Sequence, residues 1–164
     1  SDVCSSDLTG MQGDVMKESM NVARTLALKL TPQTTLDEIG DKYGIHIHCP
    51  DGATPKDGPS AGTAITTLLY SLLNKKKVKR DIAITGEINL SGHVTAIGGL
   101  KYKILGGMKA GVKHFLYPEE NEDDFKKFYN EYKLLVEGIS FYAVSTIQEV
   151  FPLVFEEEET TPNN

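Results

Sequence analysis

The sequence predicts an α/β or α+β domain in which a mixed sheet is flanked by helices. The main observation is that strand-like runs alternate with amphipathic segments of helical length along the chain. The length of 164 residues suits one compact domain rather than two. Apolar residues make up 40% and charged residues 24%, which is ordinary for a globular protein.

The N-terminal third predicts a helix, a strand and a loop, in that order. Apolar side chains recur at steps of three and four from Gly13 to Leu30, and Thr31-Pro32 ends this helix before a polar connection. Residues 45–49 alternate and stop at a proline, as a strand does. Residues 51–59 contain two glycines and two prolines and therefore form a loop with special backbone angles.

The middle of the chain predicts a buried helix and two short strands. Residues 60–73 open on a serine and are apolar on most sides, which favours a helix enclosed by the rest of the fold. A basic connection at 75–80 leads into a strand at 82–85. Residues 86–92 then turn the chain, and 94–97 return as another strand.

The C-terminal third predicts two further strands and at least two helices. A helix over 100–110 is followed directly by a glycine, the residue that favours a C-terminal cap. Residues 119–132 are polar and partly helical. Strands are expected at 115–117 and 139–144, and the last helix at 146–155.

The expected domain runs from residue 8 to residue 155. Residues 1–7 read like the translation of a common sequencing-adapter oligonucleotide, and we treat them as an adapter-derived or disordered segment. Residues 156–164 are acidic and predict a disordered tail. Because Glu156 to Glu159 carry much of the formal net charge of −6, the rest of the chain is nearly neutral.

Composition argues against several classes of protein. A nearly neutral body gives no general reason for binding nucleic acid or a membrane surface. No apolar run approaches the roughly 20 residues that cross a bilayer, and no charged-then-apolar leader opens the chain. Cys4 and Cys49 form no disulfide framework and favour a reducing compartment. These features predict a cytoplasmic protein, or one of an organelle matrix.

The loop that ends at Ser60 is the densest chemical pattern. A serine at the head of a helix lies near free backbone N–H groups, which can hold an oxyanion, and near the positive end of the helix dipole. The small residues Gly58, Ala61 and Gly62 would let a substrate backbone come close. The same pattern also fits a helix N-cap after a Pro-rich turn, so the loop alone leaves the role of Ser60 open.

A serine nucleophile needs a base, and the histidines offer no obvious one. His46 and His48 share one face of a strand, but no third ligand lies at a recognisable spacing, which favours two half-buried histidines over a metal site. A lysine can act as base when desolvation lowers its pKa. Lys101 and Lys103 flank the apolar face of the 100–110 helix on opposite sides, so periodicity does not choose between them, and a surface role is the default for either.

A family resemblance covers nearly the whole chain, from about Leu8 to Phe155. Residues 51–62, DGATPKDGPSAG, are similar to the active-site loop of Lon proteases, in which the serine of PKDGPSAG is the nucleophile. Colinear similarity extends to three other segments. These are LTG at 8–10 with GDVMKES at 13–19, ITGEI at 84–88 and IGGLKYK at 97–103. The chain thus resembles the proteolytic (C-terminal) domain of an ATP-dependent Lon-type serine protease.

The resemblance implies a serine endopeptidase that uses a Ser–Lys dyad. Ser60 matches the nucleophile, and its backbone N–H would serve the oxyanion. Lys103 matches the base, because the family uses the second lysine of Gly-Gly-Leu-Lys-x-Lys, and Lys101 is then not the base. Thr85 matches a threonine that orients the lysine amine, and is otherwise a strand-end residue. Asp57 matches a loop acid that switches the site between open and closed forms, and is otherwise a turn-forming residue.

The dyad sets a physical requirement on Lys103. From a free pKa near 10.4, a neutral amine at working pH requires a shift of about 3 units, which burial can give. Leu100, Ile104 and Ile97 are expected to supply that burial, with the Thr85 hydroxyl beside the amine. If Asp57 instead points at Lys103, it would hold the lysine charged and mark a closed, resting site.

The resemblance also implies partners. Relatives degrade unfolded or damaged proteins as homohexamers, with an ATPase module in the same chain. No phosphate loop of the Gly-x-x-x-x-Gly-Lys-Ser/Thr type occurs here, so ATP and Mg²⁺ would belong to that module, and this chain is expected to hold no cofactor or metal. The family is reported to bind DNA, and the basic residues 75–80 could contact it, although a short basic loop is more often solvated. No membrane contact is expected.

Two other interpretations remain beside an active, ATP-linked protease. One is a Lon-like peptidase without a fused ATPase, which the residues encoded upstream of Leu8 would distinguish. The other is a non-catalytic assembly module that keeps only the fold. The presence of Ser60, Lys103 and Thr85 argues against that module, since a site that has lost its activity usually lacks at least one of its catalytic residues.

Overall fold

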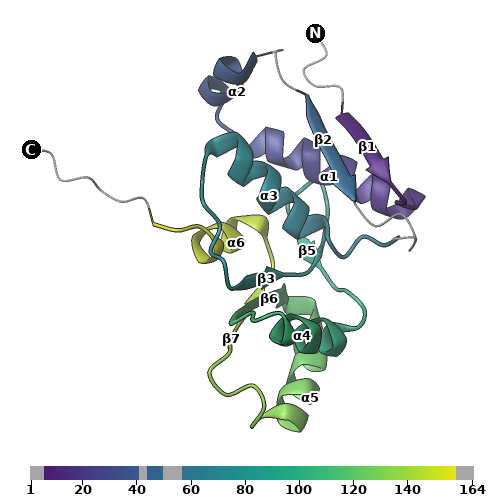
Figure 1. Ribbon diagram of the computed structural model, residues 1–164, viewed down its shortest axis with the longest axis vertical. Helices are drawn as coiled ribbons and strands as arrows, with labels where there is room; N and C mark the ends of the chain where they lie inside the picture. The colour runs from purple at the N-terminus through teal and green to yellow at the C-terminus, as the bar shows by residue number, and fades with distance from the viewer. Residues whose placement is uncertain (1–5, 41–43, 50–56, 158–164) are drawn as a thin grey trace, which may run out of the picture.

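The computed structural model describes residues 6–40, 44–49 and 57–157. Within these ranges the chain forms six α-helices and three small β-sheets, arranged as in Figure 1. Their buried side chains form two hydrophobic clusters. The predicted α/β class is confirmed, but the expected mixed sheet is divided into three separate sheets. None of the helices in the described ranges is both long and apolar enough to pass through a bilayer.

The central sheet consists of three parallel strands in the order β3-β6-β7. They span Ile82–Ile84, His114–Pro118 and Ser140–Val144. Alternate side chains of these strands enter different clusters, because successive residues of a strand point to opposite faces. Leu116 of β6 belongs to one cluster, whereas its neighbours Phe115 and Tyr117 belong to the other. The sheet is therefore covered on both faces, as parallel sheets usually are.

Helices cover the two faces of this sheet from opposite sides (Figure 1). Helices α4 (Leu100–Lys109) and α5 (Glu122–Tyr132) pack on the face that carries Phe115. Helix α6 (Ile147–Val154) packs on the opposite face together with part of α1. The glycine after α4 has a positive φ of 85°, so the predicted C-terminal cap is confirmed.

Helices α1 (Asp14–Leu30) and α3 (Gly62–Asn74) form the other half of the molecule, where they pack against each other. The buried face of α3 is rich in threonine rather than purely apolar. The hydroxyl groups of Thr66 and Thr67 donate to the carbonyl oxygens four residues earlier, at 2.8 and 2.9 Å. These bonds satisfy the buried hydroxyls within the helix itself, which explains how threonine can occupy the buried face of α3.

Four elements differ from the expectations: β1, α2 and β4 were not predicted, and β5 is shorter than predicted. Strand β1 (Ser6–Gly10) pairs in parallel with β2 (Ile45–Cys49), so the fold includes Ser6 and Asp7, which lay outside the expected domain. Helix α2 (Gln33–Ile39) occupies the expected polar connection. Strands β4 (Glu87–Ile88) and β5 (Val94–Thr95) form a short antiparallel hairpin. Strand β5 ends earlier than predicted because side chains take over its hydrogen bonds at the next two residues.

Candidate active site

Ser60 lies in a turn two residues before α3, not within the first turn of that helix as predicted. Its carbonyl oxygen accepts the backbone N–H of Gly86 at 2.9 Å and the hydroxyl of Thr85 at 3.4 Å. The Gly86 carbonyl in turn accepts the N–H and the hydroxyl of Thr63, at 3.1 and 3.0 Å. The serine is thus fixed between the end of β3 and the start of α3.

Two glycines permit this close packing. A Cβ atom at Gly86 would lie 2.5 Å from Cγ1 of Val94 and 2.9 Å from the hydroxyl oxygen of Thr63. A Cβ atom at Gly62 would lie 2.9 Å from the hydroxyl oxygen of Ser19. The sequence predicts that Gly62 leaves room for a substrate backbone, but in the structure this glycine leaves room for Ser19 of α1.

Lys103 projects from α4 towards the serine. Its Nζ atom lies 3.0 Å from the Ser60 hydroxyl oxygen, to which it donates a hydrogen bond. Lys101 faces the other way and donates to both carboxylate oxygens of Glu131 on α5, at 3.0 and 3.1 Å. Contacts with Tyr132 and Glu131 raise the pKa of Lys101 above its ordinary value. The structure therefore brings only Lys103 of this pair to Ser60.

The surroundings of Lys103 differ from the expectation in two respects. The residue is exposed rather than buried, because the apolar face of α4 that enters the core is formed by Leu100 and Ile104. The Thr85 hydroxyl donates to the Ser60 carbonyl, and among the described residues no hydrogen bond joins Thr85 to Lys103. Thr85 and Lys103 nevertheless line the same pocket.

This pocket, of about 330 Å³, opens beside the two side chains. Its walls are mainly apolar and come from α3, β3, α4 and β6; they include Ala64, Ile84, Leu100, Ile104, Phe115 and Tyr117. Tyr102 stands at its edge and is 76% exposed. Sequence reasoning missed these walls because they come from four separate segments. The pocket can hold an apolar side chain next to a hydroxyl and an amine.

The backbone at Ser60 leaves donors available for a ligand. The N–H of Gly62 bonds to the carbonyl of Pro59 at 3.0 Å. The N–H groups of Ser60 and Ala61, in contrast, donate to no other residue in the part of the chain that the structure describes. Donors so placed beside a hydroxyl could bind the negative oxygen that forms when the hydroxyl adds to a carbonyl group.

Asp57 points away from Lys103. Its carboxylate accepts the N–H of Met16, at the start of α1, at 2.9 Å, and the N–H of Gly58 at 3.1 Å. The residue before α1, Gly13, supplies no side-chain cap, and a Cβ atom there would lie 2.3 Å from Cγ of Asp57. Asp57 therefore caps α1 from outside that helix. Within the described ranges, Lys103 forms no ion pair with Asp57, the contact that would mark the closed form of the site.

The Asp57 cap gives a first prediction. Asp57→Ala should lower the free energy of unfolding by about 1 kcal/mol, the usual effect of losing an N-cap, because the Met16 N–H loses its acceptor. Asp57→Asn keeps an acceptor oxygen and should retain most of that stability. Urea unfolding measures both, with Glu137→Ala as a control, because that residue is exposed and lies in the turn after α5. Equal stability of the alanine variant and the parent would contradict the capping role.

The two strand histidines share one face, as predicted, but both are exposed rather than half-buried. The hydroxyl of Thr9 lies between them, 2.7 Å from Nε2 of His46 and 2.8 Å from Nδ1 of His48. No group of three or more His, Cys, Asp or Glu side chains among the described residues could hold a metal ion. We therefore assign these histidines no part in the site.

Proteins of one family are similar to this chain over most of its length. Residues 4–157 match the model of the Lon protease (S16) C-terminal proteolytic domain. The chain is 43% identical to the Lon protease of Flavobacterium johnsoniae over 152 residues, which are 92% of this chain and 18% of that protein. It is 45% identical to the Lon protease of Haemophilus influenzae over 149 residues, which are 90% of this chain and 18% of that protein. The chain thus spans less than a fifth of the length of these relatives.

The match covers all the elements that form the pocket, from the Ser60 turn to β6. It also covers the strand pair β1-β2 and helix α6 at the two ends of the described fold. The resemblance drawn from sequence motifs is therefore confirmed at the level of the family. The chain belongs to the Lon protease family of serine endopeptidases, as its C-terminal proteolytic domain.

Proposed function

We propose that the chain hydrolyses peptide bonds with Ser60 as nucleophile and Lys103 as general base. The observation that supports this most directly is the 3.0 Å separation between the lysine Nζ and the serine hydroxyl oxygen. The two residues lie on different elements, and both line one pocket. A non-catalytic assembly module would have no reason to maintain this contact on the edge of a cavity.

In the proposed reaction, the Ser60 oxygen attacks the carbonyl carbon of the scissile bond while its proton passes to the Lys103 amine. The Ser60 N–H, with that of Ala61 beside it, stabilises the oxyanion of the tetrahedral intermediate. When the intermediate collapses, the C–N bond breaks and the lysine returns its proton to the leaving amine. Water then attacks the acyl–serine ester while Lys103 takes one of its protons. When the ester C–O bond breaks, the lysine passes that proton to the Ser60 oxygen, which releases the acid and the free serine.

Because Lys103 is exposed in the structure, we propose that the bound substrate shields its amine from water. A peptide lying in the pocket would cover the amine and exclude water from the dyad. We propose that Thr85 acts mainly on the serine, through the Ser60 carbonyl, and so supports the orientation of Lys103 indirectly. We propose that the Asp57 cap on α1 belongs to the open form of the site, and that this cap is released when the site closes.

The pocket suggests which bonds are cleaved. Its mainly apolar walls favour a peptide with an apolar side chain on the acyl side of the scissile bond. Gly106 of α4 lines this pocket, and a Cβ atom there would meet no other atom within 4 Å. A larger residue at this position would therefore take up pocket volume without straining the fold.

The context of the reaction is proposed by analogy with the longer relatives. We propose that the chain acts in an ATP-dependent protease that degrades unfolded or damaged proteins as a homohexamer. ATP and Mg²⁺ would bind to an ATPase module, and a site of action in the cytoplasm or an organelle matrix would supply the nucleotide. Because cleavage itself uses only Ser60 and Lys103, peptide hydrolysis should not require ATP, whereas degradation of folded proteins should.

These proposals predict that the chain cleaves short peptides slowly without ATP, and prefers Leu or Phe to Asp on the acyl side of the bond. Gly106→Leu should reduce kcat/KM for the Leu and Phe peptides at least about tenfold, which corresponds to about 1.4 kcal/mol, because it occupies the pocket. Peptides with Ala at that position should be less affected. Melting temperature should not fall, since leucine favours a helix more than glycine does.

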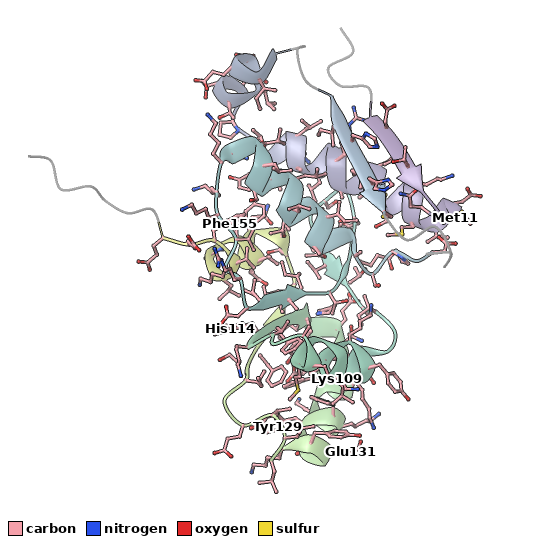
Figure 2. The ribbon with its side chains drawn as sticks, viewed as in Figure 1. Met11, Lys109, His114, Tyr129, Glu131 and Phe155 are labelled. Carbon is pink, nitrogen blue, oxygen red and sulfur yellow. The ribbon has the colours of Figure 1, made fainter. Side chains whose placement is uncertain are left out.

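Lys109→Leu is the control, because it places the same side chain on α4 at a residue that does not line the pocket. Figure 2 labels Lys109. Chromatographic analysis of the peptide fragments identifies the bond that is cleaved. A preference for charged residues, or equal activity of Gly106→Leu and Lys109→Leu towards all peptides, would exclude the proposed pocket. Rapid ATP-stimulated degradation of folded proteins by this chain alone would contradict the proposal that degrading folded proteins requires a separate ATPase module.

A further inference from the structure

The backbone that leads into α4 is held by side chains instead of a neighbouring strand. Asn121, in the 3-10 turn η2 (Glu119–Asn121), is 3% exposed. Its side-chain oxygen accepts the N–H of Ile97, and its side-chain nitrogen donates to the carbonyl of Ile97, both at 2.9 Å. One residue earlier, the N–H of Ala96 donates to the carboxylate of Glu120 at 2.8 Å. These bonds replace the ladder of a β-sheet.

The carboxamide of Asn121 is itself held in one orientation. Its nitrogen also donates to the carboxylate of Asp124, in the first turn of α5, at 3.2 Å. A carboxylate accepts hydrogen bonds but cannot donate them, so the amide of Asn121 is oriented with its NH₂ group towards Asp124. The amide oxygen is then the atom that faces the Ile97 N–H. Both polar atoms of this buried side chain are satisfied, as a fixed contact requires.

Two glycines separate this contact from the helix that carries Lys103. Gly99 has a left-handed φ of 71°, and α4 has no side-chain N-cap. A Cβ atom at Gly98 would contact nothing within 4 Å. Among the residues that the structure describes, Ile97 is the last one before α4 whose backbone forms hydrogen bonds with groups outside that helix.

Helix α5 holds α4 at a second point. Glu131, in its last turn and labelled in Figure 2, accepts both hydrogen bonds from Lys101. Asn121 immediately precedes the first turn of α5. Helix α5 thus contacts the backbone before α4 through its N-cap, Asn121, and the first turn of α4 through the weaker, exposed pair of Glu131 with Lys101.

We infer that Asn121 is a positioning residue for the Ser60–Lys103 dyad, acting through its two hydrogen bonds to Ile97. This inference rests on the proposed peptidase function. Nucleophile and base must meet within about 2.6–3.2 Å, and a displacement of about 1 Å can cost about 100-fold in rate. Asn121 touches neither Ser60 nor Lys103, so its loss should slow the chemical step without changing how tightly the peptide binds.

The decisive variant is Asn121→Asp, which is nearly isosteric. It keeps an oxygen for the Ile97 N–H but places a second oxygen against the Ile97 carbonyl. We expect kcat for a short peptide to fall about 10- to 100-fold, with KM within about twofold of the parent. Amide hydrogen exchange should become faster across residues 96–103 and stay unchanged in α3. Asn130→Asp makes the same change on the exposed surface of α5 and should alter neither measurement.

A second variant, Asp124→Asn, leaves Asn121 in place but removes the carboxylate that orients its amide. It should change kcat and exchange in the same direction, by a smaller factor. This variant tests the inference even if Asn121→Asp fails to fold. The measurements are made on the intact protein, with thermal unfolding followed in parallel.

Two results would overturn the inference. One is faster exchange across 96–103 with kcat within about twofold of the parent, because Ile97 would then be released without effect on the dyad. The other is an equal loss of protection in α3 and α4, with kcat reduced only in proportion to the folded fraction, because Asn121 would then support the fold alone. If the parent shows no Ser60-dependent hydrolysis, the proposed function itself fails, and the exchange data still report whether Asn121 fixes Ile97.

Discussion

Replacing Ser60 by alanine should abolish peptide hydrolysis and leave the fold unchanged. The substitution removes one oxygen atom whose described partner is Lys103, while the hydrogen bonds from the Gly86 N–H and the Thr85 hydroxyl to the Ser60 carbonyl remain. Loss of a nucleophile typically lowers kcat by several orders of magnitude, so we expect a decrease of at least about 10³-fold. Hydrolysis of a short apolar peptide, measured with excess purified protein, gives the rate.

Ser91→Ala is the matched control, since it removes the same atom from an exposed turn between β4 and β5. Both variants should match the parent in circular dichroism, melting temperature and state of assembly. A Ser60→Ala protein that keeps its activity within about tenfold of the parent would remove this serine from the mechanism. A variant that is inactive because it is unfolded would be recognised by its circular dichroism spectrum.

Helices and strands were predictable wherever the apolar residues of a segment repeat with a clear helical or strand spacing. Helices α1, α3 and α4 and strands β2, β3 and β6 lie within a few residues of their expected positions. The failures have physical reasons. Strand β1 is mostly polar and is stabilised by its pairing with β2, a contact that local periodicity does not reveal. Strand β5 ends at Thr95 because Glu120 and Asn121, far along the chain, take the next two backbone N–H groups.

The candidate site was predictable to a different extent. Periodicity left Lys101 and Lys103 equivalent, and the family motif selected Lys103, the lysine that lies beside Ser60 in the structure. The expectation of a buried Lys103 was wrong for this chain, because the apolar residues next to it on the helix face the core instead of the amine. Nor did the sequence indicate that Asp57 caps α1, because that contact joins residues 41 positions apart.

Replacing Lys103 by methionine should be as damaging as Ser60→Ala. Methionine keeps most of the length and the apolar stem of lysine but cannot accept a proton, so the Ser60 hydroxyl would lose its base. We expect kcat to fall by about 10³-fold or more, and the double variant with Ser60→Ala to be scarcely worse, because the two residues act as one unit. Single-turnover hydrolysis of the same apolar peptide measures all three variants.

Two further substitutions separate a base from a mere positive charge. Lys103→Arg keeps the charge, but a guanidinium stays protonated and cannot serve as base, so this variant should be as inactive as Lys103→Met. Lys101→Met breaks the pair with Glu131, an exposed contact that contributes at most about 1 kcal/mol, and should retain activity within about tenfold. Substantial activity in Lys103→Arg would mean that Lys103 acts through its charge alone. An essential Lys101 with a dispensable Lys103 would mean that the 3.0 Å contact with Ser60 is not the catalytic one.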